Sequence, residues 1–351
     1  MAFEAVDALL MEAVGRQDPP SAAFAAGCGS RVYHRAFFGK TKLEGGVDVN
    51  ADTLYDLASV TKVMATTMVA LLLMEEGRLT LDDTLPAYFE HVPEDKAGIT
   101  VRQLMTHTAG LHPSLPLRDM CGTPSDIPHA ILHAPLVCPP GAQTHYSCMG
   151  FILLQHVLEK LTGERLDRLA KKRVFDPLGM TRTGFCPPPD ENTAATEIDP
   201  VTGRPFQGVV HDGNARFAGG VSGNAGVFSS LTDCEKFVMM LAQGGGGLLA
   251  PGTLERAVRC LTPGMESSRG LGFHLGGRPG NFCGDLFPDD SFGHTGFTGT
   301  SFTVDPSTGI FTILLTNAVH PTREKDGVLP LRRRVNNAAY AAMRKRMTEE
   351  K

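Results

Sequence analysis

The sequence predicts an α/β (α+β) fold in which both chain ends build one domain and a mostly helical domain is inserted between them. Two β-prone runs lie at residues 21–39, four strand-like segments lie between residues 271 and 317, and helical patterns fill the region between. Segregation of strands and helices along a chain is typical of such a layered arrangement. We expect residues 1–62 and 216–351 to form the sheet domain, residues 63–215 the inserted domain, and a cleft to lie between the two.

Local signals predict the elements of the first part of the chain. The N-terminus alternates acidic and apolar positions with no basic region before them, which predicts an amphipathic helix ending near Gly15 and no signal peptide. A Gly-Cys-Gly-Ser turn at 27–30 predicts a β-hairpin. The apolar run at 59–76 predicts a long helix that ends at Gly77.

The remaining elements follow in the same way. Residues 148–162 are expected to form a helix before Gly163, and the polar, proline-rich stretch 186–208 a long loop. A further helix is expected over 231–243, and a closing helix from Leu329 to about Met347. The strand-like segments of the last third cover residues 271–276, 291–297, 300–306 and 309–317, with a turn at 305–309.

Composition limits the classes of partner. The chain has 351 residues and a formal net charge of −5, which gives no sign of a nucleic-acid surface, and the sequence has no 18-residue uncharged span that would insert into a membrane. The eight cysteines show no CxxC pair or zinc spacing, so we expect reduced thiols in a cytoplasmic protein. The expected partners are small molecules, and the sequence leaves the oligomeric state open.

The motif that points to chemistry is Ser59-x-x-Lys62. The common hydrolase elbow, zinc, P-loop and dinucleotide motifs are absent, and the histidines are too dispersed to predict a metal site. Positions i and i+3 share one face of a helix, and a helix N-terminus favours an anion at Ser59. Burial is expected to lower the pKa of Lys62 and make it a base for a serine nucleophile. From the spacing alone, Ser59 as an N-cap and Lys62 as an exposed residue are equally good interpretations.

Two later segments distinguish these readings. "SVTK" is followed by "HYSCMG", with Tyr146 and Cys148, and by "FGHTGFTGTS", with His294. In this order the chain resembles the serine β-lactamase and penicillin-binding-protein superfamily, and most of all its class C β-lactamase, esterase and D-alanyl-D-alanine carboxypeptidase branch. Flanking segments such as "ITVRQLMTHTAGL" and "VHDGNARFAGGVSGNAGVFSS" extend the resemblance over nearly the whole chain. It implies an antiparallel sheet flanked by the terminal helices, and no cofactor.

The resemblance also implies catalytic roles. Ser59 would be the acylated nucleophile, Lys62 would ease removal of its proton, and Tyr146 would relay protons to the leaving group. A phenol titrates near pH 10 in water, so Tyr146 needs cations beside it to act as a base. The backbone N–H groups of Ser59 and Phe297 would form the oxyanion hole.

Substrate-binding residues are implied as well. The ring of His294 and the hydroxyl of Thr295 would bond a substrate acyl or carboxylate group, and Gly296 would let substrate backbone approach. Two departures from the family pattern stand out: Cys148 replaces the asparagine of Y-x-N, and His294 replaces a lysine. Arg216 is a candidate partner for a substrate carboxylate, although a hydrogen-bonded loop clasp is the more ordinary interpretation.

These residues predict a serine acyl hydrolase acting on a small ester, peptide or β-lactam through a covalent acyl-enzyme. Both departures favour esterase-like or D-amino-acid-peptidase-like activity over efficient β-lactam hydrolysis. The alternative is a catalytically impaired penicillin-binding or regulatory protein that keeps the fold, an interpretation motivated by Cys148. Cys148 as the nucleophile is disfavoured, because no motif places a histidine base beside it.

Overall fold

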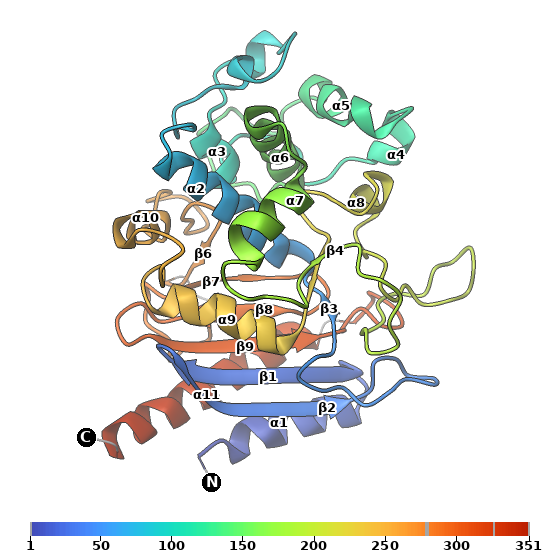
Figure 1. Cartoon of the computed structure of the whole chain (residues 1–351), viewed down its shortest axis with the longest axis vertical. Helices are drawn as coiled ribbons and strands as arrows, with labels where there is room; N and C mark the ends of the chain where they lie inside the picture. Colours follow the sequence, from blue (N-terminus) through green and yellow to red (C-terminus); the bar gives the residue numbers. More distant parts are fainter. Residues whose placement is uncertain (1, 278–280, 326, 350–351) are drawn as a thin grey trace.

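The main sheet joins the two ends of the chain. The computed structural model describes residues 2–277, 281–325 and 327–349. Within these ranges the sheet has six antiparallel strands in the order β2-β1-β9-β8-β7-β6. They are β1 (Ser21–Cys28), β2 (Arg31–Gly39), β6 (His274–Leu275), β7 (Phe292–Thr295), β8 (Ser301–Val304) and β9 (Ile310–Thr316). Because β1 pairs with both β2 and β9, as Figure 1 shows, the predicted sheet, its hairpin and the β8–β9 turn are confirmed.

Helices cover both faces of this sheet and form the rest of the molecule (Figure 1). The α-helices are α1 (Glu4–Gly15), α2 (Met68–Glu75), α3 (Val101–Met105), α4 (Leu117–Met120), α5 (Ile127–His133), α6 (Cys148–Thr162), α7 (Leu166–Ala170), α8 (Gly213–Phe217), α9 (Leu231–Ala242), α10 (Pro251–Ala257) and α11 (Val328–Glu349). Short 3-10 turns η3 (Leu85–Ala87), η4 (Glu94–Lys96) and η5 (Pro124–Asp126) and the π-helical turn η6 (Lys171–Phe175) lie between them. The helices predicted from the sequence at 148–162, at 231–243 and at both termini are confirmed.

The two faces of β1 bury different layers, because successive side chains of a strand point to opposite sides. Ala22, Phe24 and Ala26 join the core cluster that includes residues of α1 and α11. Ala23 and Ala25 join the larger cluster, which contains α9 and the helical region. The candidate catalytic residues all belong to this second side of the sheet, away from the terminal helices.

The segment that carries Ser59 is helical, but it does not begin as a regular α-helix. It consists of a 3-10 turn η1 (Ala58–Val60), a π-helical turn η2 (Lys62–Thr67) and then α2, and Gly77 follows with φ +68°. Ser59 therefore lies inside the first turn and is not an N-cap, so that interpretation is wrong. By length and composition Ala58–Glu75 could cross a membrane, yet 78% of it is buried inside the protein, which is typical of a core helix.

A second, three-stranded sheet lies beside the segment that carries Ser59. Its order is β3 (Tyr55–Asp56), β5 (Val227–Ser229) and β4 (Gly184–Phe185). Residues 186–208 form the predicted long loop, which returns to the body through an isolated bridge between Leu54 and Thr193. The large core cluster includes Leu73 of the proposed inserted domain and Phe311 of the sheet. The domain boundaries given above stay a prediction.

Candidate active site

Ser59 and Lys62 are in direct contact. The side chain of Lys62 is fully buried, and its Nζ lies 3.0 Å from Ser59 Oγ. The same nitrogen lies 3.0 Å from the carbonyl oxygen of Asn224 and 3.5 Å from Cys148 Sγ. A carbonyl oxygen can only accept a hydrogen bond, so Lys62 must donate to Asn224. Three acceptors around one nitrogen match the three donors of an ammonium group.

The charge state of Lys62 differs from the expectation. Burial acts to lower its pKa, but the acidic side chains of Cys148 and Tyr146 act more strongly in the opposite direction, and the pKa lies above the ordinary lysine value. The expected depression of the Lys62 pKa by burial is therefore wrong. At neutral pH Lys62 is therefore a cation.

Tyr146 lies at the centre of a cluster of nitrogen-bearing side chains. Its ring centroid lies 5.0 Å from Lys62 Nζ and 5.4 Å from Arg269 Cζ. Three imidazole rings surround it as well, with centroid distances of 4.4 Å for His107, 5.9 Å for His274 and 6.3 Å for His294. This brings together Ser59, Lys62, Tyr146 and His294, which the sequence could only place in order along the chain.

The three histidines of this cluster are neutral. Burial lowers the pKa of each well below its ordinary value, and the neighbouring cations Arg269 and Lys62 act in the same direction. His107 has a positional function, because its Nδ1 accepts from the Ser147 N–H at 3.1 Å and its ring packs on Tyr146. It fixes the segment that presents Tyr146.

The His294–Gly296 strand flanks the cluster, but two of its expected contacts differ. The His294 ring is fully buried and its Nδ1 lies 2.8 Å from the Thr295 carbonyl, so it faces Tyr146 and not a substrate. A Cβ at Gly296 would collide with the Leu57 carbonyl and the Thr300 hydroxyl. The space that a side chain at Gly296 would need is therefore taken by Leu57 and Thr300, not by substrate backbone. Thr295 is partly exposed and stays a candidate substrate contact.

The turn that precedes and carries Ser59 is held by the buried carboxylate of Asp56. Asp56 Oδ1 accepts from the Ala58 N–H at 2.8 Å, and Oδ2 accepts from the His211 N–H at 2.7 Å. Ala58 has φ +46°, a left-handed conformation that non-glycine residues rarely adopt. Thr298 Oγ1 donates to the Asp56 carbonyl at 2.7 Å, which ties this turn to the turn that carries Phe297. The two predicted oxyanion-hole residues are thus connected through Asp56.

Arg216 contacts its own loop. Its Nη1 donates to the carbonyl oxygens of Val210 and His211, and its guanidinium stacks 4.2 Å from the ring centroid of Phe206. The prediction that it binds a substrate carboxylate is therefore replaced by the loop clasp. Phe297, in contrast, is 58% exposed at the surface.

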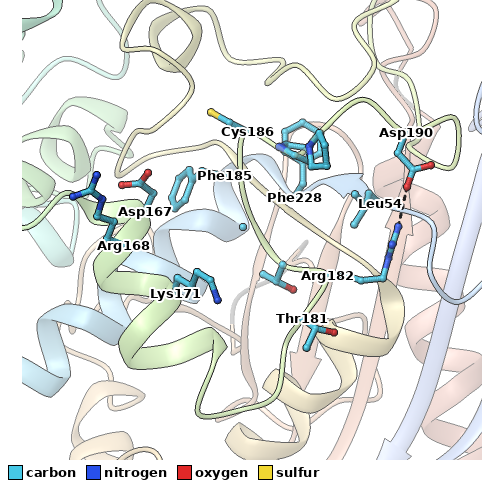
Figure 2. A pocket seen from close by; sticks show the side chains of 14 residues that line it. Leu54, Asp167, Arg168, Lys171, Thr181, Arg182, Phe185, Cys186, Asp190 and Phe228 are labelled. Carbon is cyan, nitrogen blue, oxygen red and sulfur yellow. Dashed lines mark hydrogen bonds and ion pairs between the residues drawn. The ribbon is translucent and has the colours of Figure 1, made fainter.

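Two cavities are candidates for the substrate-binding site. One, of about 280 Å³, is lined by residues that include Arg269, His274, Thr295 and Arg332, and so adjoins the Tyr146 cluster. The larger one, of about 410 Å³, has a floor of Leu54, Phe185 and Phe228 and carries the Arg182–Asp190 ion pair at its edge (Figure 2). Among the described residues neither lining includes Ser59, Lys62 or Tyr146. The smaller cavity is lined by Arg269 and His274, which lie beside Tyr146, and it is therefore the nearer of the two to the cluster.

Sequence reasoning missed Arg269, His274, Asp56 and Arg332. Asp56 is three residues before Ser59 and could have been noticed for that reason. Arg269 and His274 lie in the strand-like region that precedes His294, but no local pattern distinguishes them from surface residues. The pairing of β6 with β7 places His274, and an isolated bridge with His274 places Arg269.

Comparisons with known proteins show what the whole chain is similar to. The model of the beta-lactamase family matches residues 6–337. A protein of Escherichia coli K12 named "Putative D-alanyl-D-alanine carboxypeptidase" is 30% identical over 90% of this chain and 84% of its own length. A protein of the same name from Salmonella typhimurium is 30% identical over 82% of this chain and 74% of its own length.

Solved structures share the fold at lower identity. EstCE1, described as a hydrolase with promiscuous acyltransferase activity, has a TM-score of 0.79 and 23% identity, covering 97% of this chain and 98% of its own. Simvastatin synthase (LovD) from Aspergillus terreus has a TM-score of 0.77 and 24% identity over the same shares. A penicillin-binding protein homologue from Caulobacter crescentus has a TM-score of 0.76 and 21% identity, covering 97% of both chains. With the family model matched over nearly its whole length, this chain belongs to the beta-lactamase family.

Proposed function

We propose that this protein is a serine acyl hydrolase that forms a covalent acyl-enzyme at Ser59. The observation that carries the proposal is the contact of Lys62 Nζ with Ser59 Oγ at 3.0 Å, with Tyr146 on the other side of the same ammonium group. A nucleophile, a cation and a phenol within one buried cluster are the parts that acyl transfer requires.

Because Lys62 is a cation, we assign the proton-transfer steps to Tyr146. The Tyr146 phenolate takes the proton of Ser59 as Oγ forms its bond to the acyl carbon, and the N–H groups of Ser59 and Phe297 stabilise the oxyanion. Tyr146 then returns the proton to the leaving oxygen or nitrogen as its bond to carbon breaks. A water molecule then gives a proton to Tyr146 as its oxygen bonds to the acyl carbon. Tyr146 returns that proton to Ser59 Oγ as the ester bond to Ser59 breaks, which releases the acid.

Labelling and intact-mass measurement test this function. We expect one fluorophosphonate adduct on the native chain, no adduct on Ser59→Ala, and an unchanged adduct on the control Ser114→Ala, whose serine is exposed. Tyr146→Phe should reduce hydrolysis of a p-nitrophenyl ester by about a hundredfold or more, the usual contribution of a general base. Absence of an adduct on the native chain would favour the impaired binding protein instead.

A second substrate class is supported by the 280 Å³ cavity. Arg269 and Arg332 line it with Thr295, both arginines are buried, and neither forms an ion pair with a carboxylate within the described ranges. A substrate carboxylate would supply the missing partner. Together with the carboxypeptidase names of the relatives, this favours peptides with a free C-terminus besides simple esters. A D-alanyl-D-alanine peptide should therefore react faster than its C-terminal amide, and equal rates would contradict this class.

A further inference from the structure

One of the two charges beside Tyr146 does not come from a residue of the family motifs. In relatives with a lysine where this chain has His294, that lysine can add a second cation to the site. Here His294 is fully buried and neutral. We propose that Arg269 supplies the second positive charge that lets Tyr146 act as a base. This proposal rests on the serine hydrolase function proposed above and adds a residue to its catalytic apparatus.

The geometry places two cations beside the Tyr146 ring. The Arg269 Cζ lies 5.4 Å from the ring centroid and Lys62 Nζ lies 5.0 Å from it. Both side chains are at least nine-tenths buried, so their fields are weakly screened by solvent. Nearby cations stabilise a phenolate relative to a phenol.

The guanidinium of Arg269 is free of any competing carboxylate within the described parts of the chain. Its Nε donates to Ser267 Oγ at 2.6 Å, and its Nη1 is buried with no hydrogen-bond partner among these residues. Burial lowers its pKa to about 10, and the acidic Tyr146 side chain opposes this effect. Arg269 therefore keeps its charge at neutral pH and directs it toward the phenol.

The backbone fixes the position from which this side chain extends. The Arg269 N–H donates to Thr262 Oγ1 at 3.0 Å, and its carbonyl accepts from the Leu261 N–H at 2.8 Å. Residue 269 also forms an isolated bridge with His274 of β6. The loop thus holds the guanidinium over the ring without an ion pair to anchor it.

No other group near Tyr146 supplies the charge. The rings of His107, His274 and His294 are neutral, for the reasons given above. The Cys148 thiol contacts Lys62 Nζ, and the carboxylate of Asp212 also acts on Lys62. Both partners act on Lys62, whereas Tyr146 is the acidic side chain that acts on Arg269.

A purely structural role predicts the opposite result on substitution. A buried charge without a counterion destabilises a fold, so exchanging such an arginine for a neutral side chain should be neutral or stabilising and should leave the pH profile in place. A cation that acts on Tyr146 should instead be required for activity at neutral pH. The two roles can therefore be separated by measurement.

The experiment compares the native chain with Arg269→Gln, Arg269→Lys and the double variant Arg269→Gln/His294→Lys. With a neutral p-nitrophenyl ester, Arg269→Gln should move the acid limb of the kcat/KM profile upward by about one pH unit or more, reducing the rate at neutral pH about tenfold with little change in KM. Arg269→Lys should restore part of the lost rate. The double variant should also regain rate, because the lysine at position 294 would supply the missing cation. Thermal unfolding of each variant checks the fold.

An unchanged pH profile in folded Arg269→Gln would overturn the proposal. Failure of the underlying function would look different, because the native chain would then form no adduct at Ser59.

Discussion

At the scale of single residues, the contacts of Lys62 explain the division of labour in the site. Its Nζ contacts Ser59 Oγ, the Asn224 carbonyl and Cys148 Sγ, which an ammonium group can hold together as a donor. In the proposed mechanism Lys62 is the cation and Tyr146 is the base. Cys148 occupies a place where an amide would offer both an acceptor to Lys62 and a donor to substrate, whereas a thiol does either weakly.

This difference gives a prediction for Cys148→Asn. The amide N–H would add a hydrogen bond to the carbonyl of a peptide substrate, worth about 1 kcal/mol, so kcat/KM for a D-alanyl-D-alanine peptide should rise about fivefold. A p-nitrophenyl ester should change less than about twofold, because its leaving group does not need that contact. Cys148→Ser, which lacks the amide, is the matched control and should show no gain. An equal gain for both substrates would refute this account of position 148.

At the scale of elements, the turn from Asp56 to Val60 shows why the helix starts irregularly. The Asp56 carboxylate holds the N–H of Ala58, and the hydroxyls of Thr298 and Thr300 hold the carbonyls of Asp56 and Leu57. These contacts come from segments about 240 residues away in the chain, and they impose the left-handed Ala58 conformation. The turn is set by tertiary structure and not by helix propensity.

The buried Asp56 makes stability depend on pH. Burial raises its pKa from 3.8 to about 6, against the opposing hydrogen bonds from His211 and Ala58, and Asp212 and Arg216 are the other charges that act on it. Because the folded pKa exceeds the unfolded one, the folded state takes up a proton first, and this group adds stability as the pH falls through about 6. The free energy of unfolding of the native chain, relative to Asp56→Asn, should therefore rise by about 1 kcal/mol from about pH 7 to about pH 5.

Urea unfolding of both proteins at several pH values measures this difference, because most other titrating groups cancel in the comparison. A difference that is flat or that falls over the same range would show that Asp56 is not a buried carboxylate with a raised pKa. Activity should instead fall as the pH falls through about 6, since a protonated carboxyl group holds the Ala58 N–H less firmly.

At the scale of the whole molecule, local patterns were enough for most of the fold. The hairpin, the Gly163 stop and the terminal helices depend on residues within a few positions of one another, and so does the Ser59–Lys62 spacing. Arg269 beside Tyr146 and Asp56 beside His211 depend on distant segments meeting, which a single sequence does not encode as a pattern. Arg216 illustrates the reverse case, because a lone arginine near a motif says nothing about its Phe206 and carbonyl contacts.

The two-layer arrangement gives a prediction that separates stability from activity. Leu10 of α1 is fully buried in the cluster between the sheet and α11, on the face opposite the site, while Met11 beside it is 61% exposed. Leu10→Ala should lower the free energy of unfolding by about 2 to 5 kcal/mol through lost burial and a residual cavity, and Met11→Ala should change it by less than about 0.5 kcal/mol. Thermal and urea unfolding measure both. Because the sheet stands between this layer and the Ser59 cluster, kcat per folded molecule should be the same in both variants, and a parallel loss of kcat in Leu10→Ala would mean that the outer layer also positions the catalytic residues.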